Sequence, residues 1–114
     1  MTNEEIEKLL SHLKELVARD DFYAVYRRGD KFPLRNSAIK KIVPLLKVSE
    51  FKKRKLDHNG SGDFIFVFIT RRGRRIYIKF KFVFKGGREK VKFISFHFAL
   101  LHNARINGGK QWKQ

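Results

Sequence analysis

The sequence has no cysteine, and this absence excludes disulfide bridges, thiolate metal sites and cysteine nucleophiles. No apolar run approaches the roughly 20 residues that a membrane-spanning helix needs. The amino terminus carries glutamates where a secretion signal needs a basic patch and an apolar run. These absences favour a cytoplasmic protein that has no contact with a membrane.

Acidic residues are also scarce, because 11 Asp and Glu stand against 27 Lys and Arg, which gives a net charge of +16. Residues 1–21 hold three bases and six acids (net −3), whereas residues 22–114 hold 24 bases and five acids (net +19). Such a surplus favours a polyanionic partner, and nucleic acid is the commonest one. An anionic membrane, an acidic protein and a merely solvated basic surface are the alternatives.

The length of 114 residues allows one domain and is too short for two. Apolar residues make up 42% of the chain, which is enough for a core and excludes a wholly disordered protein. The sequence contains no internal repeat. We therefore predict a single domain over residues 1–106, followed by a flexible basic tail over residues 107–114.

The first elements are read from apolar spacing and caps. Thr2 and Glu5 have capping-box spacing, which predicts the start of a helix. Six apolar residues follow at helical intervals, namely Ile6, Leu9, Leu10, Leu13, Leu16 and Val17. Residues 22–26 then predict a short strand, and residues 28–30 a turn.

The middle of the chain is less regular. A second helix is predicted through residues 38–43, capped by Asn36 or Ser37 and broken by Pro44. Residues 50–56 fit either a short basic helix or a strand.

Three longer strands are predicted at residues 64–70, 75–84 and 90–98, joined by glycine-containing turns. The order of helix, strand, helix and meander predicts an α+β fold, in which N-terminal helices pack on a small, mainly antiparallel β-sheet.

Strand pairing decides which side chains share a face. A two-residue turn at Arg72-Gly73 would pair Ile69 with Ile76, and a five-residue loop at residues 86–90 would pair Phe80 with Phe96. This register predicts a core layer of Ile65, Val67, Ile69, Ile76, Ile78 and Phe80. It predicts a second face with Phe66, Phe68, Tyr77, Lys79, Lys81, Phe93, Ser95 and His97. A slip of one residue would rearrange both faces.

An aromatic and basic sheet face is typical of a single-stranded RNA platform, since rings stack on bases and amines hold phosphates. A second hydrophobic layer is the alternative, and it is favoured for Phe66 and Phe68. Neighbouring lysines oppose a positive charge on His97, which favours the neutral imidazole that a general base needs. An ordinary half-buried surface histidine is the alternative there.

Three stretches of the sequence resemble MqsR-type toxins of bacterial toxin–antitoxin pairs. The likeness lies in Leu10–Val17, Val48–Lys53 and the segment from Tyr77 to His97. It implies a RelE-like fold and metal-free cleavage of mRNA, inhibited by a cognate antitoxin. In that chemistry a base takes the proton of the ribose 2′-OH, cations stabilise the phosphorane charge, and an acid protonates the 5′ leaving oxygen.

By position in this resemblance, Lys53 matches a basic residue of the family site and Tyr77 matches its tyrosine. His97 stands where the family often has lysine, and the glutamine-like position of the family falls near residues 64–66, where nothing comparable exists. The predicted catalytic residues are His97, Tyr77, Lys53 and Lys79. The predicted RNA-binding residues are Lys52, Arg54, Lys55, Lys81, Arg72, Arg74 and Arg75.

The four histidines lack metal-ligand spacing with carboxylates, so no metal and no other cofactor is expected. The expected partners are RNA, specifically mRNA, and a cognate antitoxin protein. The alternative function is a non-catalytic basic nucleic-acid-binding protein, whose affinity would come mainly from phosphate contacts.

Overall fold

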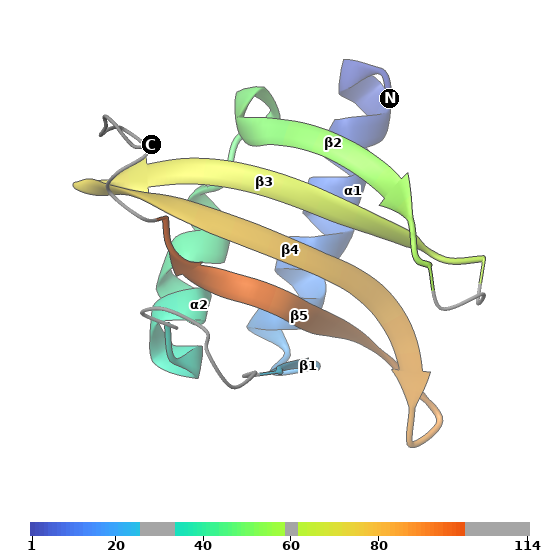
Figure 1. The fold of residues 1–114 in the computed structure, drawn as a ribbon. Coiled ribbons are helices and arrows are strands. Elements are labelled where there is room, and N and C mark those ends of the chain that lie inside the picture. The colour runs from blue at the N-terminus through green and yellow to red at the C-terminus, as the bar shows by residue number, and fades with distance from the viewer. Residues whose placement is uncertain (26–33, 59–61, 100–114) are drawn as a thin grey trace.

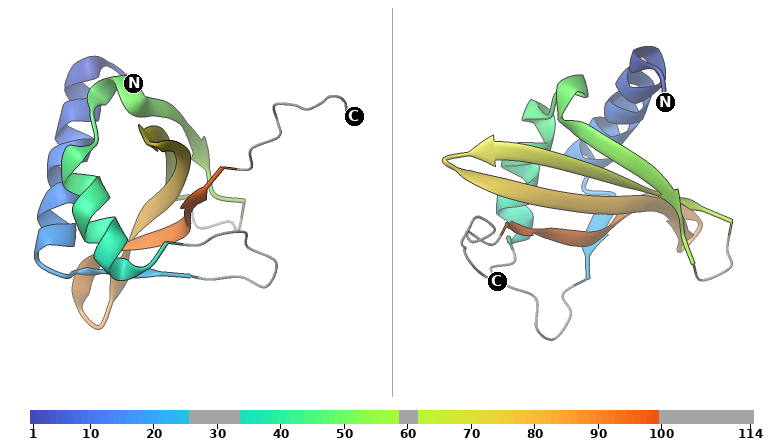
Figure 2. Two further views of the ribbon diagram at one scale, coloured as in Figure 1. Left: turned by 90° about the vertical axis from the view of Figure 1, so that its left-hand side faces the viewer. Right: turned by 45° about the horizontal axis from the view of Figure 1, so that its top comes forward.

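The computed structural model describes residues 1–25, 34–58 and 62–99. The elements are α1 (Asn3–Ala18), β1 (Phe22–Ala24), α2 (Asn36–Ile42), β2 (Phe51–Leu56), β3 (Phe64–Arg72), β4 (Arg74–Lys85) and β5 (Arg88–Phe98), with short 3₁₀ turns at Val43–Leu45 and Val48–Glu50. The predicted α+β class is confirmed. Figure 1 shows α1 and α2 behind the sheet, and Figure 2 shows from the side that both lie on the same side of it.

The five strands form one sheet in the order β1-β5-β4-β3-β2. β1 pairs with β5 in parallel, and the other three pairings are antiparallel. The sheet is therefore mixed, with β1 and β2 at its edges.

α1 forms as its sequence predicts. The Thr2 hydroxyl accepts a hydrogen bond from the Glu5 backbone N–H at 3.1 Å, and the Glu5 carboxylate accepts one from the Thr2 N–H at 2.8 Å. All six residues of the predicted apolar stripe are buried. They meet Phe68, Phe80 and Phe93, whose side chains are fully buried, so the core lies between the helices and the sheet.

Two local predictions for the middle of the chain are wrong. The N-cap of α2 is Arg35, which makes no side-chain capping bond, so neither Asn36 nor Ser37 caps this helix. The helical alternative for residues 50–56 is also wrong, because Phe51–Leu56 form β2, which pairs antiparallel with β3 except at a β-bulge. Pro44 ends α2 within a 3₁₀ turn, as expected. The predicted turn at residues 28–30 and the tail at residues 107–114 lie outside the described residues.

The predicted register of β3 and β4 is wrong by one residue. Gly73 alone separates the paired residues Arg72 and Arg74, and its φ of +77° suits glycine. Phe68 therefore pairs with Ile78, and both belong to the core. The whole strand turns over: Phe66 and Phe68 face the helices, whereas Ile65, Val67 and Ile69 face away from them.

The predicted register of β4 and β5 is also wrong. Gly86 and Gly87 both have positive φ, of 66° and 78°, and form a two-residue turn that pairs Lys85 with Arg88. A β-bulge between Lys79 and Phe80 then shifts the ladder, so that Phe80 pairs with Phe93. Phe93 thus lies in the core, and its predicted place on the opposite face is wrong.

Candidate nucleic-acid interface

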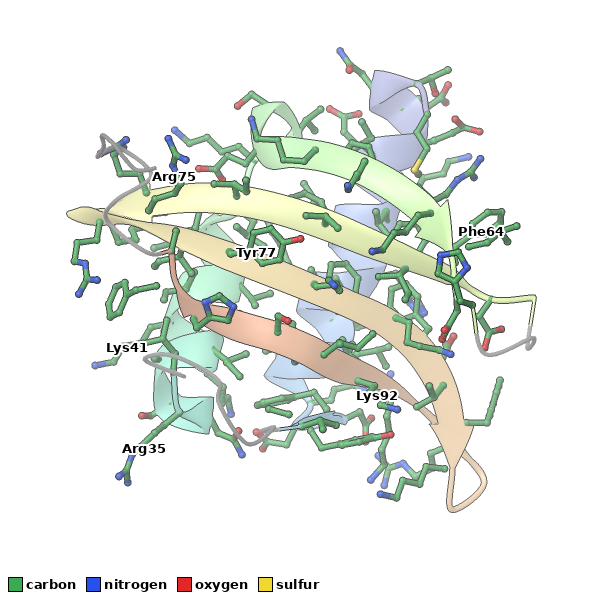
Figure 3. All side chains as sticks on the ribbon, viewed as in Figure 1. Arg35, Lys41, Phe64, Arg75, Tyr77 and Lys92 are labelled. Carbon is green, nitrogen blue, oxygen red and sulfur yellow. The ribbon has the colours of Figure 1, made fainter. Side chains whose placement is uncertain are left out.

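The sheet has one side that neither α1 nor α2 covers, and we call it the open face (Figure 3). Alternation along β3, β4 and β5 places there every second side chain, between those that enter the core. Its members include Lys53, Lys55, Ile65, Val67, Ile69, Arg71, Arg75, Tyr77, Lys79, Lys81, Lys92, Ile94, Ser95 and His97. The side chains of Arg75, Tyr77 and Lys92 point toward the viewer in Figure 3.

Tyr77 and His97 lie directly opposite each other on β4 and β5. Their rings stack, with centroids 5.8 Å apart and planes at 22°. Both side chains are half-buried. The predicted pairing of Phe80 with Phe96 would put His97 opposite Lys79, so this pairing is a correction, but Tyr77 and His97 do share a face as predicted.

One nitrogen of the His97 imidazole is held by the backbone. Nδ1 lies 2.9 Å from the carbonyl oxygen of Phe98. A carbonyl only accepts hydrogen bonds, so this contact assigns the proton of the neutral ring to Nδ1. The lone pair is then on Nε2, which is the form of imidazole that can take a proton from a substrate.

The β-bulge in β5 is what brings His97 to the open face. Without the shift between Lys79 and Phe80, the ladder would continue in the register of Phe80 and Phe93, and His97 would pair with the core residue Ile76. With the shift, Phe96 enters the core and His97 turns outward. Bulges commonly re-aim side chains in this way near functional sites.

Lys79 and Lys53 lie in one row across the open face. Lys79 pairs with Ser95 on one side and with Val67 on the other, and Val67 pairs in turn with Lys53. Strand spacing puts the backbones of Lys53 and Lys79 about 10 Å apart. The row therefore puts Lys79 two residues from Tyr77 on β4, and Lys53 two strands further out on the same face.

Lys81 lies on the same face but is neutralised. Its Nζ is 2.7 Å from an Asp57 oxygen and 3.0 Å from an Asp63 oxygen, and only 5% of the residue is exposed. The hydrogen bond to Asp57 outweighs burial and raises the pKa of the Lys81 ammonium. Lys81 therefore anchors the end of β2 to β4, and its charge is already offset by carboxylates.

The other predicted RNA-binding residues divide between the two sides of the sheet. Lys55 pairs with Ile65 and faces the open side, whereas Arg54 pairs with Phe66 and its guanidinium lies 4.2 Å from the centroid of Phe64. Lys52 sits within the β-bulge of β2, unpaired in the ladder.

At the β3–β4 hairpin, alternation puts Arg75 on the face of Tyr77. Arg74 lies on the helix side, with its guanidinium 4.5 Å from the Phe98 ring centroid, and Arg72 reaches the Leu45 carbonyl at 3.5 Å. Sequence reasoning missed Arg71, which pairs with Arg75, and Lys92, which pairs with Lys81. Both follow from the correct register, and no local motif marks them.

Residues 1–25, 34–58 and 62–99 contain neither a metal-ligand cluster nor a membrane-spanning helix. No three His, Asp or Glu side chains come together as a metal-ligand group. No helix in these ranges has the length and apolar character to cross a bilayer.

No protein-family model, no curated protein and no solved structure matches this chain. The RelE-like fold and the likeness to MqsR-type toxins therefore rest on the sequence segments alone.

Proposed function

We propose that this protein is a metal-independent endoribonuclease that cleaves single-stranded RNA on the open face. The observation that carries the proposal is the stacked pair of Tyr77 and His97, with the imidazole proton fixed on Nδ1 and with Lys79 at the next outward position of β4. A net charge of +16 supplies the attraction for a polyanion.

The proposed reaction uses the ribose 2′-OH as the nucleophile. His97 Nε2 takes the 2′-OH proton, the 2′ oxygen forms a bond to the adjacent phosphorus, and the bond from phosphorus to the 5′ oxygen breaks. The Tyr77 hydroxyl donates a proton to that leaving oxygen. The products are a 2′,3′-cyclic phosphate and a 5′-hydroxyl end, and proton exchange with water restores both side chains.

Lysines of the open face stabilise the charge that develops on the phosphoryl oxygens. Lys79 stands beside the reacting pair and Lys53 lies two strands away, on the same row. Donors held in place before the reaction cost little reorganisation in the transition state. Lys53 and Lys79 thus act both in binding and in turnover.

An enzyme of this kind needs control, since it would cleave the RNA of its own cell. We infer that a cognate antitoxin protein inhibits it by laying an acidic surface over the open face. The support is the resemblance described above and the concentration of basic side chains on this face.

The test is incubation of the protein with single-stranded RNA in excess metal chelator, followed by analysis of the product ends. Cleavage to cyclic phosphate ends, lost in His97→Ala while RNA binding is retained, supports the proposal. If the parent protein binds RNA and leaves it intact, the alternative function holds, which is that of a non-catalytic nucleic-acid-binding protein. That alternative is favoured by the absence of a polar side chain from the open face at residues 64–66.

A further inference from the structure

The open face contains a hollow of about 340 Å³ next to the candidate catalytic pair. Lys79, Lys81 and Lys92 line it, together with Asp57 and the aliphatic side chains of Ile65 and Ile94. Its volume lies at the small end of the range for ligand pockets, which starts at about 300 Å³. The hollow therefore has room for one nucleotide rather than for a larger ligand.

The charges around the hollow favour an anion. Lys92 pairs directly with Lys81 in the ladder, and like charges in such positions repel each other. Asp57 and Asp63 offset Lys81, but Lys92 forms no ion pair with any residue in the described ranges. Asp57 is itself held by Lys81 at 2.7 Å, so its carboxylate opposes an incoming phosphate only weakly.

The remaining walls suit a base or a ribose. Ile65 is 8% exposed, and it belongs to the open face rather than to the main core. Ile94, from β5, also lines the hollow. Apolar walls combined with ammonium groups match a nucleoside monophosphate better than they match a bare anion.

The position of the hollow relates it to the Tyr77–His97 pair. Lys79 lines the hollow and lies two residues from Tyr77 along β4, about 7 Å away at the rise of a β-strand. That step is comparable with the length of one nucleotide in an extended strand.

We propose that the hollow is a subsite for one nucleotide of a single strand, adjacent to the nucleotide whose phosphate meets Tyr77 and His97. Its place in the strand rests on the proposed function, whereas the ability to bind a nucleoside monophosphate does not. The substrate is thus an extended single strand, because a base held in this hollow is unpaired.

The first test is titration of the full chain with uridine 5′-monophosphate, uridine and inorganic phosphate, followed by nuclear magnetic resonance. The nucleotide should bind at least about tenfold more tightly than either fragment and should shift the amide signals of Ile65 and Ile94. Equal binding of phosphate alone, or shifts confined to other regions, would overturn the proposal.

Three variants sharpen this test. Lys92→Gln should weaken nucleotide binding at least about fivefold, and Ile94→Trp should abolish it by filling the hollow. Lys41→Gln removes the same charge from an exposed position of α2 and should keep the parental affinity (Figure 3). If Ile94→Trp fails to fold, the nucleotide affinities of Lys92→Gln and Lys41→Gln still test the subsite. Equal affinity of these two variants refutes it.

RNA cleavage separates this inference from the proposed function. If the protein binds the nucleotide with the predicted variant pattern but cleaves no RNA, the nuclease function is refuted and the subsite is supported. If the parent cleaves RNA but binds no nucleotide, and Lys92→Gln cleaves RNA with an unchanged KM, the nuclease function is supported and the subsite is refuted.

Discussion

The salt dependence of RNA binding distinguishes the two sides of the sheet, and neighbouring residues of β2 provide the comparison. Lys53 pairs with Val67 and faces the open side, whereas Arg54 pairs with Phe66 and lies against Phe64 on the helix side. Replacing either residue with glutamine removes one positive charge. Only the replacement of Lys53 should remove a phosphate contact.

The expected size of the effect follows from counterion release. Each phosphate contact contributes about 0.7 to the slope of log affinity against log salt for a single strand. Lys53→Gln should therefore make the slope less negative by about 0.7, and its affinity deficit should shrink about 2.6-fold between about 50 and about 200 mM salt. Arg54→Gln should keep the parental slope.

The assay is fluorescence anisotropy with a 2′-O-methyl RNA, which binds but has no 2′-OH to attack. The same slope change in Lys53→Gln and Arg54→Gln would show that the protein binds RNA by its overall charge. A slope change in Arg54→Gln alone would place the RNA on the helix side of the sheet. Either result refutes the assignment of the open face.

Two further predictions concern stability and are measured by urea unfolding. Phe80→Ala should lower the free energy of unfolding by about 3–5 kcal/mol, because Phe80 is fully buried, whereas Phe84→Ala at 79% exposure should change it by less than about 0.5 kcal/mol; equal losses would contradict the described core. Burial raises the pKa of Asp21, but hydrogen bonds from Arg19 and Arg88 outweigh it and hold that pKa below the usual 3.8. The ionised Asp21 carboxylate therefore stabilises the fold above its usual pKa, and this contribution is lost as the pH falls through its lowered pKa. Asp21→Asn should therefore reduce the decrease in unfolding free energy at acid pH. The same pH profile of stability in the parent and in Asp21→Asn would contradict this role.

The helix and the strands were predictable because their signals are local. The Thr2–Glu5 capping box and the apolar stripe fix α1 from sequence alone. The apolar and alternating runs likewise located β3, β4 and β5 to within two residues at each end. Residues 50–56 stayed ambiguous, because a run of four basic residues has no apolar period, and pairing with β3 decides the outcome.

Strand register was not predictable, because it depends on how tightly each turn closes. Gly73 closes its hairpin one residue more tightly than expected, and this exchanged the faces of Phe68 and Val67. The β-bulge at Ile94 of β5, opposite Lys79 and Phe80, has no sequence signature, and it decides where His97 points. Tyr77 and Lys79 were placed together correctly because alternation within one strand does not depend on its partner.

The most direct test of the central claim is cleavage of a single-stranded RNA in excess chelator by the parent protein and by His97→Ala. The account predicts 2′,3′-cyclic phosphate ends from the parent, and a rate about 10²- to 10⁴-fold lower in His97→Ala with RNA affinity retained. Parental cleavage rates in His97→Ala, or no cleavage by the parent when all the RNA is bound, would contradict it.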